Sequence, residues 1–186
     1  MRWFVFAVVA FALVVVELSV RNVFVLRSLG NIAPSFVFIL VVFVSLFAPR
    51  STTLWAAWAL GMAIDLTTPI PQGGERVGPL IGAHALGFPF ASFMVLQIRA
   101  MLFRRRALTL AVITPAAYIA ATVVIIAVYA MHAWYPGEHL AWSERSLPAE
   151  LSRRVGIGVY TGLLALVMNP LLVWTMPMWG FKTRRE

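Results

Sequence analysis

The sequence predicts an all-α integral membrane protein whose six transmembrane helices form one bundle. Of its 186 residues, 61% are hydrophobic and only 12% are charged, and the mean hydropathy is +0.88. A soluble domain of this length would need many more polar residues to cover its surface. Helices are predicted instead of barrel strands because the apolar segments are long, whereas membrane strands have about 10 residues of alternating polarity.

Six apolar segments approach the length of about 20 residues that a helix needs to cross a bilayer. They cover residues 3–20, 32–47, 52–68, 79–98, 107–131 and 155–179. Little of the chain lies outside them, so residues 1–186 are predicted to form a single membrane domain without a soluble domain. The first segment follows Arg2, but no small-residue cleavage pattern comes after it. We therefore interpret it as an uncleaved anchor and not as a signal peptide.

Local signals refine the ends of two of these helices. Ser51 directly precedes the third apolar segment and is a candidate N-cap. The sixth helix is predicted to begin outside the membrane near Leu147. Pro148 suits a first helical turn, and Glu150 can pair with Arg154 at the i,i+4 spacing.

The basic residues favour a cytoplasmic position for both chain termini. With the N-terminus inside, nine Lys and Arg residues fall in cytoplasmic parts and six fall in outer loops, which agrees with the positive-inside rule. Arg104, Arg105 and Arg106 form the main cytoplasmic basic cluster. Because most of the excess charge lies beside the spans, the net charge of +8 predicts contact with anionic lipids and not with nucleic acid.

Asp65 is the most informative single residue, because it ends a run that is otherwise fit for lipid. An ionised side chain in hydrocarbon costs from about 3 to more than 10 kcal/mol. The third span runs outward, so Asp65 is predicted near its outer end. One interpretation is an interfacial carboxylate that reaches water and marks the end of the helix. The other, which we adopt, is a fixed polar group that organises the bundle or faces a partner.

Two further ionisable residues are predicted at a similar depth. Glu17 is followed four residues later by Arg21, a spacing that favours a local ion pair. His84 lies near the start of the fourth span, where a lone histidine is more often a hydrogen-bonding helix contact than a ligand. A polar patch shared by Glu17, Asp65 and His84 is the alternative interpretation.

Small residues recur at four-residue intervals, which lets helix backbones approach closely in lipid. Gly61 and Gly82 belong to two such pairs, and Gly158 with Gly162 forms the densest one. Most of these pairs are predicted to pack inside the bundle, although the face with Gly158 and Gly162 could instead dock a partner's helix. Prolines inside three spans are predicted to kink their helices: Pro89, Pro115 and Pro170.

Nothing in the sequence predicts catalysis, a cofactor or a metal. The chain has no cysteine, which excludes disulfides and thiolate metal sites. It also has no phosphate-binding glycine loop, no hydrolase serine motif and no zinc-protease motif. His132, Glu138 and His139 match no established metal-ligand spacing. We therefore expect a protein that is not an enzyme.

Three motifs follow one another in residues 32–98. An apolar span led by Pro34 covers residues 34–47, and the next span ends in Gly-Met-Ala-Ile-Asp-Leu at residues 61–66. A turn with glycines then leads to Leu-Ile-Gly-Ala-His-Ala-Leu at residues 80–86. In this order and spacing the chain resembles the family of the rod shape-determining protein MreD. It differs from the usual family pattern in its long outer loops, at residues 67–78 and 132–154.

The resemblance implies a non-enzymatic inner-membrane subunit of the bacterial cell-elongation machinery. Such proteins bind MreC, a bitopic protein with a periplasmic domain, and help couple peptidoglycan synthesis to the MreB cytoskeleton to maintain cell shape. Other membrane proteins of the elongation complex are further candidate partners.

The family also resembles the six-helix S-components of energy-coupling-factor vitamin transporters, which bind a ligand on their outer side. The alternative function is therefore that of a substrate-binding membrane subunit for a small molecule such as a vitamin. Glu17, Asp65 and His84 are predicted on that outer side.

Overall fold

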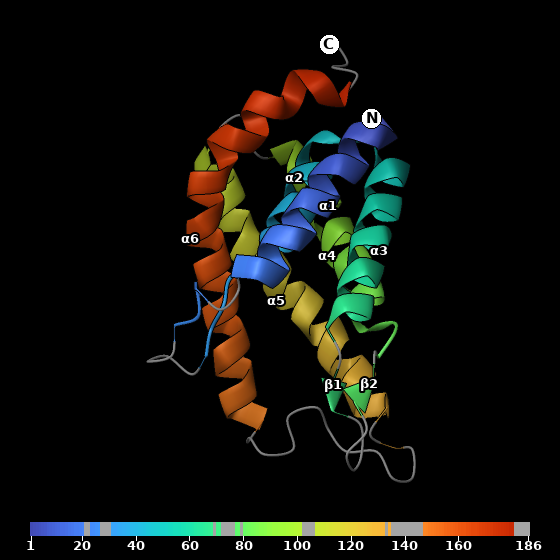
Figure 1. Ribbon diagram of the computed structural model, residues 1–186, viewed down its shortest axis with the longest axis vertical. Helices are drawn as coiled ribbons and strands as arrows, with labels where there is room; N and C mark the ends of the chain where they lie inside the picture. Colours follow the sequence, from blue (N-terminus) through green and yellow to red (C-terminus); the bar gives the residue numbers. More distant parts are fainter. Residues whose placement is uncertain are drawn as a thin grey trace.

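Six helices dominate the computed structural model, as the sequence predicts (Figure 1). The structure describes residues 1–20, 23–26, 31–68, 70–71, 77–78, 80–101, 107–132, 134 and 147–180. The helices are α1 (Trp3–Val20), α2 (Phe36–Phe47), α3 (Arg50–Thr67), α4 (Ala83–Ile98), α5 (Ala107–His132) and α6 (Leu147–Trp179). A short 3-10 turn, η2 (Arg99–Met101), continues α4.

Several helix ends differ from the predicted segments for identifiable reasons. The second segment was expected from residue 32, but α2 begins at Phe36 because Ser35 is its N-cap. The fourth was expected from residue 79, but α4 begins only after Gly82, whose φ of +121° is not helical. The prediction of Ser51 as an N-cap is wrong, since α3 already starts at Arg50 and Pro49 occupies the cap position. The start of α6 at Leu147 is confirmed.

The centre of the bundle is α2. All of its residues except Phe47 are buried, and it contacts each of the other five helices. Its sequence is apolar on every side, which is the pattern of a helix enclosed by protein. The only polar side chain in it is Ser45, whose hydroxyl donates to the carbonyl of Val41 at 2.7 Å and lies 3.0 Å from the hydroxyl of Ser92 on α4.

Two features depart from a simple set of helices. A small antiparallel pair of strands, β1 (Ile70–Pro71) and β2 (Val77–Gly78), lies between α3 and α4, with Ile70 opposite Gly78. The last part of α6 turns across one end of the bundle towards the start of α1 (Figure 1). The backbone N–H of Arg2 donates to the carbonyl of Trp179 at 2.8 Å, so the chain begins and α6 ends at the same end of the molecule.

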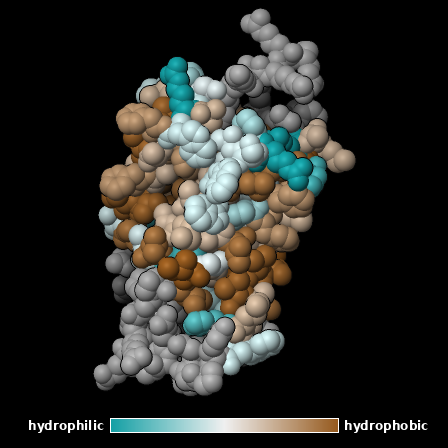
Figure 2. Space-filling model, turned by 90° about the vertical axis from the view of Figure 1, so that its right-hand side faces the viewer, coloured by the Kyte–Doolittle hydropathy of each residue, from teal (hydrophilic) through white to brown (hydrophobic). Residues whose placement is uncertain are grey.

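Two helices of the described chain are long and apolar enough to cross a membrane by length and composition. They cover Leu108–His132 and Pro148–Trp179, and only 33% and 28% of their apolar windows are buried. The core helix of a soluble protein would be mostly buried, so these exposed faces fit an apolar surrounding. On the side where α3 lies, strongly hydrophobic residues gather in the lower middle of the surface, residues of intermediate hydropathy run through its centre, and the most hydrophilic ones lie mainly near its upper end (Figure 2).

Candidate functional site

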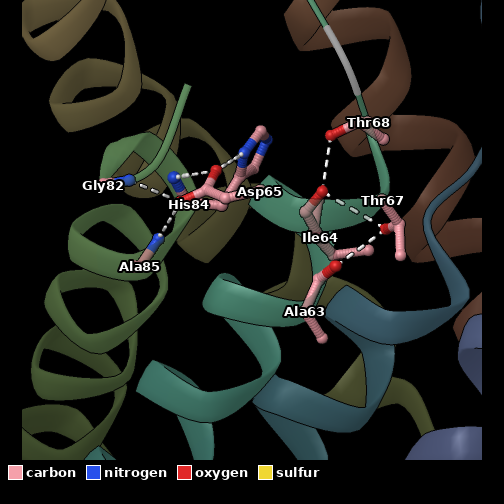
Figure 3. A network of polar contacts seen from close by, with 8 residues as sticks. All are labelled: Ala63, Ile64, Asp65, Thr67, Thr68, Gly82, His84 and Ala85. Atoms are coloured by element: carbon pink, nitrogen blue, oxygen red, sulfur yellow. Dashed lines mark hydrogen bonds and ion pairs between the residues drawn. The ribbon is translucent and has the colours of Figure 1, made fainter. Parts of the chain in front are cut away.

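Asp65 lies in the last turns of α3, and its buried carboxylate binds the start of α4 (Figure 3). The backbone N–H groups of Gly82 and Ala85 donate to Oδ2 at 2.9 and 3.0 Å. The backbone N–H of His84 donates to Oδ1 at 3.0 Å, and the Nδ1 atom of its ring lies 2.7 Å from the same oxygen. Both carboxylate oxygens therefore contact the first turn of the neighbouring helix.

This arrangement supplies α4 with a cap that its own sequence lacks. The first N–H groups of a helix have no carbonyl partner inside the helix, and the N-cap residue of α4 is Gly82, which has no side chain to accept them. The carboxylate of Asp65 accepts three of these N–H groups from a different helix. Its negative charge also lies at the positive end of the α4 dipole.

Gly61 makes the approach of α3 to α4 possible, and Gly82 allows the backbone turn before α4. Gly61 precedes Asp65 by one helical turn and lies on the same face of α3. A Cβ atom at this position would overlap the backbone of His84 and Ala85, with the Cα atom of Ala85 only 2.7 Å away. Gly82 adopts a φ of +121°, which side-chain-bearing residues rarely take. The threonine hydroxyls at the end of α3, Thr67 and Thr68, donate to carbonyls of their own helix (Figure 3).

His84 adds a side-chain contact to the same site. A carboxylate can only accept hydrogen bonds, so the contact at 2.7 Å requires a proton on Nδ1 of the ring. The ring also packs edge-on against Phe88, with the two centroids 5.5 Å apart. The structure thus gives His84 a hydrogen bond between helices, in which the imidazole is oriented by the carboxylate and by an aromatic neighbour.

Glu17 forms a second site of the same kind, at the start of α2. Its Oε2 accepts the backbone N–H of Val37 at 2.8 Å, and the hydroxyl of Ser35 lies 3.1 and 3.3 Å from the two carboxylate oxygens. The Ser35 hydroxyl in turn accepts the N–H of Phe38 at 3.2 Å. The backbone N–H of Ser35 donates to the hydroxyl of Thr161 on α6 at 3.1 Å. Buried Pro34 leads into this capped start.

The structure therefore brings together two of the three predicted ionisable residues. Asp65 and His84 share one site, while Glu17 belongs to the start of α2. The predicted partner of Glu17, Arg21, lies outside the described residues. So do the basic residues of the cytoplasmic cluster, Arg104, Arg105 and Arg106, and the histidine-containing segment with Glu138 and His139.

The glycines of α6 face another helix of the same chain. A Cβ atom at Gly162 would meet the ring of Pro115 at 2.6 Å and the carbonyl of Ala111 at 2.7 Å, and one at Gly158 would meet Tyr118 at 3.2 Å. These glycines let α5 and α6 pack closely, which is the internal role of small residues in membrane bundles. Because α5 occupies this face, Gly158 and Gly162 are not open to a partner's helix.

Sequence reasoning missed Ser35, which completes the site at the start of α2, and Arg99, which binds the end of α2. Ser35 carried a usable signal, because a serine directly before an apolar run is a typical N-cap. Arg99 had no comparable signal in the sequence. Its guanidinium donates to the carbonyls of Ala48 and Ser45, at 2.6 and 3.3 Å, and so binds the end of α2. At the other end, the predicted pair of Glu150 and Arg154 forms at 2.8 Å.

The chemistry of these sites is that of a fixed scaffold. Each carboxylate is held by the N–H groups of a helix start, which is where its charge is most stabilised. Among the described residues, no group of three or more His, Asp or Glu side chains could hold a metal ion. The arrangement can set the relative position of helices α1 to α4, because each carboxylate binds N–H groups at the start of a neighbouring helix.

Comparison with known protein families gives a match over most of the chain. A family model described as rod shape-determining protein MreD matches residues 1–135, which include both carboxylate sites and helices α1 to α5. Searches of curated proteins and of solved structures gave no match.

Proposed function

Because the chain belongs to the MreD family, which acts in rod shape determination, we propose that it is a non-enzymatic inner-membrane subunit of the bacterial cell-elongation machinery. In this proposal it binds MreC and helps couple peptidoglycan synthesis to the MreB cytoskeleton. The family match over residues 1–135 is the observation that carries the proposal.

The contacts of the carboxylates of Asp65 and Glu17 support a scaffold and not a catalyst. Asp65 and Glu17 both bind the starts of neighbouring helices. Their carboxylates therefore fix the positions of these helices relative to one another. A protein that must hold a bitopic partner in the membrane needs a bundle of fixed shape, because a lost helix contact in lipid is not restored by the hydrophobic effect.

We further propose that all six helices cross the membrane and that both termini are cytoplasmic. The meeting of the chain start with the end of α6 supports an even number of crossings. In this orientation Asp65, His84 and Glu17 lie near the periplasmic side. The basic cluster at Arg104, Arg105 and Arg106 would then face anionic lipid headgroups or cytoplasmic partners.

The proposal is tested by co-purification with MreC from the same genome. The tagged chain is reconstituted in nanodiscs with MreC, and we expect the two proteins to elute together after affinity capture. A bitopic protein of unrelated function, expressed at the same level, serves as the control. If MreC is not retained above this control, the proposed partner is wrong.

A second experiment tests the role in cell shape. Cells that lack their own MreD are expected to regain rod shape when they express this chain. The variant Gly61→Leu, which cannot keep α3 against α4, should fail to restore the shape. The matched variant Ala59→Leu adds the same side chain at an exposed position of the same helix and should succeed.

The alternative of a small-molecule-binding subunit is not proposed. It required Glu17, Asp65 and His84 to offer polar groups to a ligand on the outer side. In the structure the two carboxylates bind helix starts, and the imidazole donates to Asp65.

A further inference from the structure

The last part of α6 runs in a different direction from the rest of this helix (Figure 1). With 33 residues and about 1.5 Å of rise for each, a straight α6 would be about 50 Å long, whereas the hydrocarbon core of a bilayer is about 30 Å thick. The helix contains Pro170 and Pro177, and proline weakens the backbone ladder where it occurs. Figure 1 shows the last part of α6, in red, turned across the end of the bundle.

The packing of α6 against α5 shows at which residue α6 can change direction. Gly162 lies against the carbonyl of Ala111, and the two helices run in opposite directions. About four residues further along, α6 reaches the level at which α5 begins, at Ala107. From Pro170 onwards α6 therefore extends past the start of its main neighbour, and another surface must hold it.

That surface is the end of α2 together with the start of α1. The indole of Trp179 is fully buried and packs against Phe43 and Phe6, with ring centroids 5.7 and 6.5 Å apart. Its Nε1–H donates to the hydroxyl of Thr175 at 2.9 Å, so its polar atom is satisfied. The backbone bond from Arg2 to Trp179 completes the attachment. Residues 170–179 thus lie across the bundle and are anchored at their far end.

Most apolar residues of this segment lie on two stripes, whereas Val173, which is 41% exposed, lies on neither. One is buried on the bundle and includes Leu172 and Trp179, which are 3% and 0% exposed. The other consists of Leu171, Trp174 and Met178, which are 57%, 81% and 58% exposed. At about 100° for each residue, the two stripes lie roughly 110° apart around the helix axis. The exposed stripe therefore points sideways from the bundle and not along its axis.

We propose that residues 170–179 form an interfacial helix whose stripe of Leu171, Trp174 and Met178 inserts between lipid headgroups and acyl chains. Lipid surrounds a membrane bundle on its sides, which is the direction of this stripe. The stripe also continues the exposed apolar face of α6 that contains Val159, Leu163 and Val167.

The residue types fit this position in the membrane. Tryptophan is enriched at the boundary between headgroups and acyl chains because its ring is amphipathic. In the sequence, Lys182, Arg184 and Arg185 follow the helix directly, and such cations favour anionic headgroups. The partner of this surface is thus a lipid surface with anionic headgroups, at the end of the bundle where the chain begins.

Spin labels on single cysteines test the proposal, and the absence of native cysteine removes any background. The variants Leu171→Cys, Trp174→Cys and Met178→Cys are labelled in nanodiscs of phosphatidylcholine and phosphatidylglycerol. Collision with oxygen and with an aqueous nickel complex gives the depth of each label. We expect the three labels to lie at one shallow depth, with more contact with oxygen than with nickel.

Two sets of control positions make each outcome decisive. Pro177→Cys, on another side of the same segment, should contact nickel more than Met178→Cys does. A straight helix would instead place the labels at 171 and 178 about 10 Å apart in depth, which would overturn the proposal. Contact with nickel at all three positions, or shielding from both reagents by another protein surface, would also overturn it.

A second set of labels distinguishes failure of this proposal from failure of the proposed membrane function. Labels at Val159→Cys, Leu163→Cys and Val167→Cys are expected to contact oxygen and to change steadily in depth along α6. If these positions contact nickel instead, α6 does not cross the membrane and the function proposed above is wrong. If they behave as membrane positions and the end of α6 does not, only the interfacial helix is rejected.

Discussion

The starts of α4 and α2 differ in how their unpaired N–H groups find partners. At α4 the carboxylate of Asp65 accepts the N–H groups of Gly82, His84 and Ala85, and the N-cap glycine contributes no side chain. At α2 two side chains accept the N–H groups: Glu17 accepts that of Val37, and Ser35 accepts that of Phe38.

At α4 one carboxylate replaces a local cap because the backbones of two helices touch there. Gly61 brings the backbone of α3 against that of α4, so the short side chain of Asp65 reaches three N–H groups. Glu17 has a longer side chain and is only partly buried. We therefore expect the site at α4 to be less tolerant of change than the site at α2, and the following predictions test this difference.

The largest effect is expected for Gly61→Leu. Its side chain would overlap backbone atoms of His84 and Ala85, which cannot rotate away, so α3 and α4 must separate. We expect a loss of about 3 kcal/mol or more in unfolding free energy, measured by denaturant titration in detergent. Ala59→Leu, on the exposed side of α3, is the control. Equal stability of the two variants would mean that the helices are not in contact at Gly61.

The next effect is expected for Asp65→Ala. Three N–H groups at the start of α4, of which that of Ala85 is buried, would lose their acceptor, which costs about 2–4 kcal/mol in total because each lacks a partner in its own helix. Asp65→Asn keeps one acceptor oxygen and should lose roughly half as much. Both values come from the same titration as for Gly61. An asparagine variant less stable than the alanine variant would contradict capping as the role of Asp65.

Much of the fold could be predicted from the sequence, because the apolar segments are long and separated by turn residues. The order and number of helices followed from them, and so did the beginning of α6 near Leu147. The end of α6 was less predictable. Pro170 indicated a kink, but its direction depends on the distant contact of Trp179 with Phe43 and Phe6.

The sites were predicted as residues but not as contacts. Gly61 was expected at a close helix approach and Asp65 at an outer helix end, yet nothing local identifies the start of α4 as their partner. The interpretation of Glu17 relied on its spacing to Arg21. Its contacts with Ser35 and Val37, 18 and 20 residues away, were not predicted, because no local spacing identifies the start of α2 as its partner.

A smaller effect is expected for Glu17→Ala. The variant leaves the N–H of Val37 without its acceptor, but Ser35 still caps Phe38. We expect a loss of about 1–2 kcal/mol, less than that of Asp65→Ala under the same conditions. The isosteric variant Glu17→Gln keeps the shape of the side chain and removes its charge, so the stability difference between Glu17→Gln and the natural protein reports the contribution of the charge. A loss for Glu17→Ala that exceeds the loss for Asp65→Ala would reverse the order of the two sites.

The smallest effect is expected for Ser35→Ala, at about 1 kcal/mol, because Glu17 can still accept the N–H of Val37. The informative measurement is the combination with Glu17→Ala. The two side chains share a hydrogen bond, so the loss in the double variant should differ from the sum of the single losses. Combining Ser35→Ala with Asp65→Ala should instead give a simple sum. If the losses add in both double variants, Glu17 and Ser35 act at α2 as two independent contacts. The proposed difference between a shared cap at α2 and a single carboxylate at α4 would then be wrong.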